Sequence, residues 1–385
     1  AARPSIAGSI DSIETPDDYT VVLKLKYPDG VLIAKLAHMN SAMLSPTTKD
    51  IDLMTNPIGT GAYVMDEQVP GSEYTLVYRG DDYWGEEPDI KKIKFSVVQE
   101  LSTAIARLET GEADFIPVLD PTQIARVDGI ANINLEIQPN SSVTYLGINQ
   151  FDGTNSDFLQ DVEVRKAIAM AIDNKAFADT LNGGAQAMTS SLPTSVFGYT
   201  DEAANYAYAY NPEEAKKIVE EKGVGDEPIV ILTSTVPLTQ TVAEYVQASL
   251  QAVGFTNVSL KPQEFATYLD TAKQSGEADL TILTWSNVTG DGTEYFDPNL
   301  NWEMSSKRVK YNDADFIQLV TERRESVDQD DRVGKLDAAN KKATEDVAIV
   351  PLFNRLQVFA FSKAYSTVFQ YPGEFFYVME FKVAK

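Results

Sequence analysis

The sequence predicts an α/β protein with more than one lobe, and three observations support this prediction. The chain has 385 residues and 43% of them are hydrophobic, whereas a single hydrophobic core stops growing at about 250–300 residues. Between residues 227 and 285, strand patterns alternate with helix patterns, which favours a parallel sheet. Before that region, several strand patterns surround one helix pattern, as in an α+β lobe.

The first third of the chain is predicted to be mostly strands. TVVLKLKY alternates apolar with polar residues after a Pro-Asp-Asp turn, and the same pattern recurs twice (residues 20–27, 74–80 and 91–98). In NPIGTGAYVM, residues 56–65, two glycines and a proline come before a further strand pattern. A helix is expected from Leu101 to Gly111, because Leu101, Ile105 and Leu108 recur at helical spacing and a glycine suits the helix end.

The middle of the chain is predicted to form a strand, one helix and an extended connection. These segments are residues 141–151, 161–181 and 183–198. The βαβαβ region then follows, with strands at 228–235, 257–262 and 278–285. Helices are expected between them, one of them striped by Val242, Val246 and Leu250. The tail contains two helix patterns and a buried strand.

The loop that begins at Trp285 is where a ligand is expected. In open parallel sheets, ligands bind beyond the carboxyl ends of the strands. The strand that ends in Trp285 leads directly into an acidic, glycine-punctuated, aromatic loop that reaches Trp302. Trp285 is expected to line the pocket, since aromatic rings commonly line peptide and sugar sites. For Tyr295 and Trp302, a place in the pocket and a place in the core both stay open.

Composition excludes several classes of function. With 32 Lys and Arg against 57 Asp and Glu the net charge is −25, which repels nucleic acid. Cysteine is absent and His38 is the only histidine, so thiolate chemistry and two-histidine metal sites are excluded. No nucleotide-binding or hydrolase signature is present. We therefore expect no catalytic residue, no metal and no cofactor, although acidic pairs such as Asp291 with Glu294 leave a glycoside hydrolase as an alternative.

Several segments share motifs with a known protein family. They are NPIGTGAYVM, YRGDDYWGEEPDIKKIKFSVV, LETGEADFIP, YLGINQF, FLQDVEVRKAIAMAIDNKAF and VAIVPLF. In this order they resemble the extracellular solute-binding proteins of ABC importers, which include oligopeptide, dipeptide, glutathione and nickel receptors. Two departures occur early: Ala62 replaces a proline of the family pattern, and Gly80-Asp81-Asp82 replaces Asn-Pro-Asp.

The resemblance implies a bilobal periplasmic-binding-protein-like (type II) fold, with two α/β lobes joined by hinge strands. Residues 1–144 would form part of lobe 1, residues 145–346 lobe 2, and residues 347–385 would return to lobe 1. Family members carry a further N-terminal portion before the strand that TVVLKLKY resembles, so an incomplete first lobe is expected.

The resemblance also implies a set of solute-binding residues. In the family's peptide receptors, an Asp three residues after the strand-end Trp pairs with the α-ammonium of the peptide. Here Val288 occupies that position, and Asp291 is expected to take over the role. The complete expected set is Tyr145, Asn149, Trp285, Ser286, Asn287, Thr289, Asp291, Phe353, Asn354 and Arg355. For Arg355, a bond to a solute carboxylate and a plain surface position stay open.

The function implied is that of a non-enzymatic receptor that captures an oligopeptide or dipeptide and delivers it to an ABC permease. An oligosaccharide receptor of the same family is the alternative, because the same aromatic rings could stack on sugars. Nickel transport is disfavoured by the single histidine. The resemblance implies a monomer that is periplasmic or anchored by lipid at the cell surface.

Overall fold

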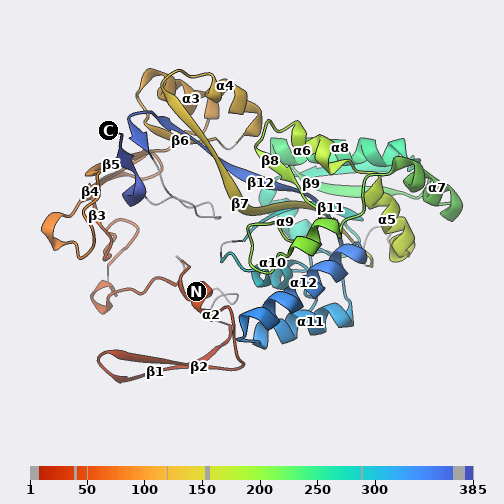
Figure 1. The fold of residues 1–385 in the computed structure, drawn as a ribbon, viewed down its shortest axis with the longest axis horizontal. Helices are drawn as coiled ribbons and strands as arrows, with labels where there is room; N and C mark the ends of the chain where they lie inside the picture. The colour runs from red at the N-terminus through yellow and green to blue at the C-terminus, as the bar shows by residue number, and fades with distance from the viewer. Residues whose placement is uncertain are drawn as a thin grey trace. The chain divides into compact units, whose positions relative to one another are not determined.

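The computed structural model divides into two compact units (Figure 1). It describes residues 8–38, 41–49, 51–118, 120–151, 157–287, 289–366 and 378–384. Unit 1 consists of the described residues within Ala1–Ser41, Asn140–Leu181 and Ala185–Leu356, and unit 2 of those within Ala42–Pro139, Asn182–Gly184 and Gln357–Lys385. The expected lobe boundaries at residues 145 and 347 stay predictions.

A mixed sheet forms the centre of unit 1. Its strands are β9 (Ile229–Ser234), β10 (Val258–Gln263), β11 (Leu280–Ser286), β7 (Ile133–Ile148), β12 (Ile349–Ser362) and β8 (Ala185–Ala187). Their order is β10-β9-β11-β7-β12, and β8 pairs with β12. β9 is parallel to both β10 and β11, while β11 is antiparallel to β7. The βαβαβ prediction is therefore confirmed.

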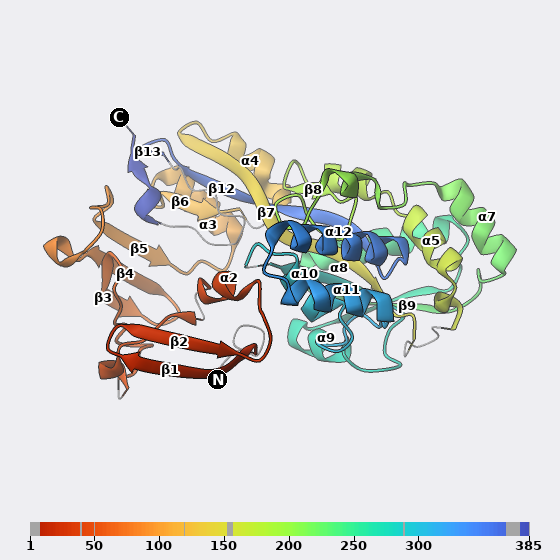
Figure 2. The same ribbon diagram turned by 60° about the horizontal axis from the view of Figure 1, so that its bottom comes forward.

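Helices cover both faces of this sheet (Figures 1 and 2). One face carries α5 (Val162–Met170), α6 (Asn174–Asp179), α7 (Pro212–Lys222) and α8 (Pro237–Ala252), and the other carries α9 (Phe265–Thr271), α10 (Thr293–Asn299), α11 (Ala314–Glu325) and α12 (Gln329–Glu345). Each set of helices packs on its own core of buried apolar side chains. β7 serves both cores, because Leu146 and Ile148 enter the first while Val143 and Tyr145 enter the second.

Three local predictions were wrong. The single helix expected at 161–181 is two helices, α5 and α6, and the side chain of Asp173 accepts the N–H of Ala176 to begin the second. The connection at 183–198 contains β8, which pairs with β12. The loop after Trp285 contains α10, and Tyr295 in this helix is 1% exposed, so Tyr295 belongs to the core.

Unit 2 contains a three-stranded antiparallel sheet and a smaller core. The sheet comprises β3 (Tyr63–Val69), β4 (Glu73–Tyr78) and β5 (Lys92–Ser96). α3 (Leu101–Thr110) ends at Gly111 in the left-handed conformation with φ 74°, as the sequence predicts. α3 packs with α4 (Ile124–Asp128) and β6 (Phe115–Pro117), and β6 pairs with the second half of β12.

A hairpin and a short helix precede the first strands of unit 2. β1 (Ile10–Asp17) pairs with β2 (Thr20–Leu25), and α2 (Leu32–Leu36) follows. A small pair near the end of the chain joins β13 (Tyr365–Ser366) to β14 (Lys382–Val383). The hairpin segment belongs to unit 1 and is hydrogen-bonded to the rest of that unit: the N–H of Gly30, for example, donates to the carbonyl of Arg324 at 3.1 Å.

Two glycines allow a test of how tightly α12 packs in unit 1. Gly198 has φ +100°, and a Cβ added there would lie 2.4 Å from Cδ1 of Leu336, whereas nothing lies within 4 Å of a Cβ at Gly334. Gly198→Ala should lower the free energy of unfolding by at least about 1 kcal/mol through overpacking and backbone strain. Gly334→Ala, in the interior of the same helix, should raise it by about 0.5–1 kcal/mol. Urea denaturation of both variants measures the difference, and equal midpoints would contradict the packing described.

Candidate functional site

The pairing of β7 with β11 places a row of hydroxyl groups at one end of the unit 1 sheet. The pairing runs from Ile148 with Leu280 to Ser142 with Ser286. Its first half is buried and, apart from Thr281, apolar, whereas its second half carries hydroxyls on both strands. Oγ1 of Thr144 lies 3.0 Å from Oγ1 of Thr284, and Oγ of Ser286 donates to Oγ of Ser142 at 3.4 Å.

Asn354 connects β12 to the same end of the sheet. Its side-chain amide donates to the carbonyls of Asn140 and Ser142, both at 2.8 Å, and only 4% of the residue is exposed. On the other side, the hydroxyl of Ser141 donates to the carbonyl of Asn287. Side chains of three strands and the loop after β11 therefore meet at this end, where hydrogen bonds hold the backbone carbonyls in fixed directions.

Trp285 and its neighbours form the accessible part of this cluster. Thr284 is exposed, while Trp285 and Ser286 are partly exposed. The Trp285 ring packs against the core that α9–α12 cover, so it lies on the opposite face of β11 from the side chains of Thr284 and Ser286. Among the described residues, the indole N–H of Trp285 has no hydrogen-bond partner. The indole nitrogen itself is buried, so the partly exposed part of Trp285 that a solute could contact is its ring.

The loop after Ser286 folds around the side chain of Asn287, which is 2% exposed. Its Oδ1 accepts the N–H groups of Gly290 at 2.9 Å and Thr289 at 3.2 Å. Its Nδ2 donates to the carbonyl of Asp291 at 2.6 Å. The N–H of Thr289 also donates to Oε2 of Glu294 at 2.8 Å. The loop is therefore held by its own side chains, and Gly290 has the left-handed φ of 72° that this turn requires.

Asp291 forms a buried ion pair with Arg332 of α12. Nη2 of Arg332 donates to Oδ2 of Asp291 at 2.5 Å, and the two side chains are 6% and 9% exposed. The second oxygen of Asp291, Oδ1, accepts the N–H of Thr293 at 2.9 Å. Both carboxylate oxygens thus have partners within the chain. The expected role of Asp291 as an ammonium anchor stays a prediction.

Not all of the sequence-predicted residues lie together. Ser286, Asn287 and Asn354 lie at the polar sheet end, and Asn287 holds Thr289 and Asp291 of the following loop. Trp285 precedes Ser286 on β11, and Arg355 follows Asn354 on β12, where it pairs with Ala185. Tyr145 and Phe353 are 0% exposed; the hydroxyl of Tyr145 donates to Oδ1 of Asn299 at 2.7 Å, and Phe353 stacks on Phe177. Asn149 lies seven residues along the chain from Ser142, or about 23 Å at about 3.3 Å per residue, and its side-chain amide donates to the carbonyl of Ala278. The predicted Val288 position lies outside the described residues.

Comparison with known proteins decides the family. Residues 2–306 match the model of the bacterial extracellular solute-binding proteins, family 5. The chain belongs to this family. Its fold is accordingly the type II periplasmic-binding-protein fold that the motifs predicted.

Relatives in family 5 carry names that refer to different ligands. The dipeptide-binding protein of Escherichia coli is 28% identical over 345 residues, which is 84% of this chain and 62% of that protein. Heme-binding protein A of Haemophilus influenzae is 26% identical over 335 residues, 81% of this chain and 59% of that protein. The chain thus spans about three fifths of the length of these relatives. The structure of the Helicobacter pylori periplasmic binding protein DppA, in complex with the peptide STSA, matches with a TM-score of 0.80 at 21% identity, and covers 99% of this chain and 75% of that one.

Sequence reasoning missed several residues of this candidate site. The hydroxyls of Ser142, Thr144 and Thr284 had a detectable signal, because polar residues interrupt strands that are otherwise apolar. Arg332 had none, since it is 41 positions from Asp291 and only the packing of α12 brings the two side chains together.

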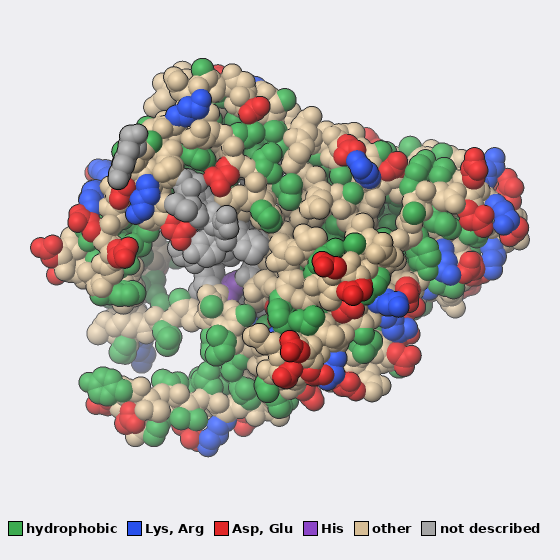
Figure 3. Space-filling view, viewed as in Figure 1, with side chains coloured by type: hydrophobic (Ala, Val, Ile, Leu, Met, Phe, Trp, Pro, Cys, Tyr) green, Lys and Arg blue, Asp and Glu red, His purple; other side chains and the backbone are tan. Residues whose placement is uncertain are grey.

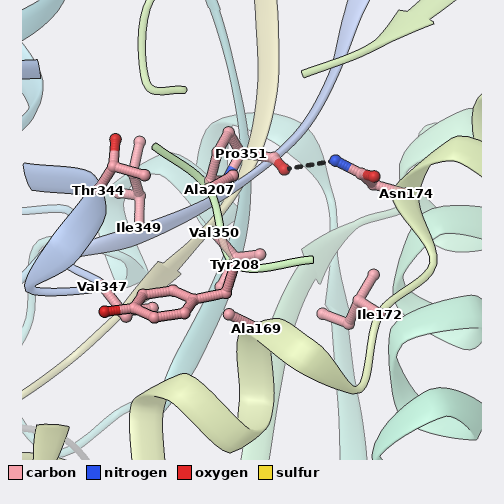
Figure 4. A pocket seen from close by; sticks show the side chains of 10 residues that line it. All are labelled: Ala169, Ile172, Asn174, Ala207, Tyr208, Thr344, Val347, Ile349, Val350 and Pro351. Carbon is pink, nitrogen blue, oxygen red and sulfur yellow. Dashed lines mark hydrogen bonds between the residues drawn. The ribbon is translucent and has the colours of Figure 1, made fainter. Parts of the chain in front are cut away.

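Two cavities, one in each unit, are lined by residues other than those of the polar sheet end. In unit 1, a cavity of about 20 Å³, lined mainly by apolar side chains, holds the volume of one water molecule (Figure 4). In unit 2, a cavity of about 730 Å³ lies among β5, α3 and β6. None of the ten sequence-predicted residues lines either cavity.

Neither a metal-binding cluster nor a membrane-spanning helix occurs in the part of the chain that the structure describes. Within the described ranges, no three acidic or histidine side chains gather in a way that could hold a metal ion. Acidic and basic side chains are interspersed on the face seen in Figure 3. None of the helices in those ranges combines the length and the apolar character of a membrane span.

Burial changes the acid–base behaviour of two tyrosines behind the site. Burial raises the pKa of Tyr145 well above the usual range, and nearby Tyr268 adds to this effect while Arg308 opposes it. Burial likewise raises the pKa of Tyr295, with a further contribution from Tyr145. The folded state therefore favours the neutral phenols.

The raised tyrosine pKa values predict a loss of stability in alkali. The contribution of each neutral tyrosine to the free energy of unfolding is fully present below about pH 10, the pKa of tyrosine in the unfolded chain. It decreases as pH rises above that value, by about 1.4 kcal/mol per pH unit for each such tyrosine. Tyr145→Phe should lower stability at pH 8, because Asn299 loses its donor, and should make the decline between pH 10 and 11 less steep. Urea denaturation across this pH range measures both effects; an unchanged slope in the variant would show that Tyr145 titrates normally.

Proposed function

We propose that this family 5 protein is the solute-binding component of an ABC importer and that it captures a peptide. Membership of the family, over residues 2–306, is the observation that carries the proposal. The names of its relatives favour a peptide as the solute, because both the E. coli dipeptide-binding protein and the H. pylori protein with its bound peptide match most of this chain.

The chemistry of the polar sheet end supports a peptide ligand. A peptide backbone offers alternating N–H and carbonyl groups, which hydroxyl and amide side chains can match in either direction. Thr284, Ser286 and Thr289 supply such groups at accessible or partly accessible positions, and the ring of Trp285, which projects from the opposite face of β11, supplies apolar surface at the end of the strand. We place the solute against these residues, with Asn287 and Asn354 fixing the backbone beneath it and Arg355 beside it on β12.

The remaining expected residues have supporting roles in this proposal. Tyr145 and Phe353 hold the strands from within the core, and Asn149 fixes the opposite end of β7. Binding proceeds without turnover: Asp291 and Glu294 engage Arg332 and the N–H of Thr289 respectively, so neither is poised as a general acid or base. The partner is an ABC permease, and the protein acts as a monomer in the periplasm or, anchored by lipid, at the cell surface.

Thermal unfolding with pools of ligands tests the proposal. Di- to hexapeptides should raise the midpoint of unfolding in a saturable manner, because a ligand that binds only the folded state stabilises it. Oligosaccharides should leave it unchanged, and a chromogenic glycoside should not be hydrolysed. Stabilisation by sugars alone would move the assignment to an oligosaccharide receptor, and glycoside turnover would replace the receptor with a hydrolase.

A threonine substitution tests whether the polar sheet end contacts the solute. Thr284→Val preserves the shape of the side chain but removes the hydroxyl, and should weaken binding of a stabilising peptide by about 0.5–1.5 kcal/mol, or roughly three- to tenfold. Thr241→Val, at an exposed threonine of α8, is the matched control and should bind normally. Isothermal titration calorimetry measures both, and equal affinities would remove Thr284 from the site.

A further inference from the structure

The side chain of Arg332 is enclosed between two segments that are distant in sequence. Its Cζ lies 4.9 Å from the centre of the Phe197 ring. On the other side is the backbone of Gly30, where an added Cβ would lie 2.9 Å from both Cδ and Nε of Arg332. The guanidinium group is thereby directed at Asp291, and its rotamer is fixed by packing rather than by the ion pair alone.

Phe197 also binds the loop that Asp291 supports. The N–H of Phe197 donates to the carbonyl of Gly290 at 2.8 Å, and the N–H of Gly292 donates to the carbonyl of Phe197 at 3.0 Å. Arg332 therefore contacts the loop after β11 twice, through the carboxylate of Asp291 and through the residue that pairs with Gly290 and Gly292. We call the described residues of this loop, Asn287 and Thr289–Gly292, the solute loop.

The segment Asp29–Val31 closes the other side of Arg332. Asp29 is 7% exposed, and its carboxylate accepts from Oγ of Ser9 at 2.6 Å, Nζ of Lys35 at 2.9 Å and the N–H of Val31 at 3.1 Å. This bracing holds Gly30 so close to the connection between α11 and α12 that a Cβ would lie 2.3 Å from the carbonyl oxygen of Ser326, the C-cap residue of α11. Only glycine fits at this position without movement of the backbone.

We propose that Arg332 is a positioning residue for solute binding, and that Asp29–Val31 keeps it in place. In this arrangement Asp291 fixes the solute loop and does not anchor the ammonium group of a peptide. An ammonium group could reach Asp291 only by displacing a buried guanidinium, which would then be left unpaired in the interior. Recognition of the solute therefore does not depend on a free amine. The inference rests on the proposed function for its solute, whereas the support of the loop can be observed without one.

Hydrogen exchange of the solute loop tests the positioning role in the absence of any ligand. Arg332→Gln should accelerate exchange at the amides of Thr289, Gly290 and Thr293, since their acceptors depend on the position of Asp291 and Asn287. Arg332→Lys should restore part of the protection. Lys335→Gln is the matched control, because Lys335 lies one turn along α12 and pairs only with exposed Asp331 in the described structure. Unchanged exchange in Arg332→Gln would overturn the proposal.

A substitution at Gly30 tests the contribution of the N-terminal segment. Gly30→Ala should displace this segment from α12 and accelerate exchange at the same three amides, although the change lies outside the loop. Gly61→Ala is the control, because nothing lies within 4 Å of a Cβ at that position. Normal exchange in Gly30→Ala would show that Arg332 and Asp291 hold the solute loop without the N-terminal segment, and would overturn the role given to Asp29–Val31.

Peptides with a free or an acetylated N-terminus separate positioning from anchoring. If Asp291 positions the loop, the affinities of wild-type protein for the two forms should differ by no more than about threefold. Arg332→Gln should lower both affinities equally, by about tenfold or more, and each tenfold corresponds to about 1.4 kcal/mol. A preference of tenfold or more for the free amine, abolished by Asp291→Asn, would overturn the proposal. If no peptide binds the wild-type protein, the proposed function fails, and the exchange measurements still decide the positioning role.

Discussion

The antiparallel pairing of β7 with β11 is the constraint on which the rest of unit 1 depends. It joins strands that are separated by more than 130 positions at their nearest paired residues, Ile148 and Leu280. Apolar side chains along one half of the pair provide anchor points for two cores and eight helices. Hydroxyl side chains along the other half leave that end unsuited to further packing and suited to hydrogen bonding. One pairing therefore produces both the stability of the unit and its candidate site.

Charge is used inside unit 1 in a way that the overall composition does not suggest. The chain carries a net charge of −25, yet the ion pairs of Asp291 and Asp297 involve three arginines. These are Arg323 and Arg324, which pair with Asp297, and Arg332, which pairs with Asp291. Arg323 is fully buried against Asp297 at 3.0 Å, and burial lowers the pKa of Arg323, an effect that Asp297 opposes. Breaking a buried ion pair of this kind costs free energy, because it leaves one charge buried without a partner and without contact with water. They are therefore better suited to fixing a loop than to exchanging partners with a solute.

The sequence was sufficient for the features that depend on local pattern. Strand and helix alternation predicted the parallel part of the sheet, and the strand expected to end near Trp285 is β11, while the solute site at its end stays a prediction. Features that depend on distant contacts were missed. β7 begins eight residues earlier than expected, because its first half pairs as a strand although it lacks a clear alternation, and β8 exists only because β12 offers an edge. Arg332 and Gly30 acquire their roles entirely from the packing of α12, which no local spacing encodes.

The central claim is that a peptide solute lies against Trp285 at the polar end of the β7–β11 pair. The most direct test is ¹⁹F NMR of protein labelled with 5-fluorotryptophan, since the chain has only three tryptophans and Trp285→Phe, Trp84→Phe and Trp302→Phe assign the three resonances. Titration with a stabilising peptide should shift the Trp285 resonance in a saturable manner, at the same affinity that calorimetry gives. Saturable binding that shifts the resonance of Trp84 or Trp302 and leaves that of Trp285 unmoved would contradict the account.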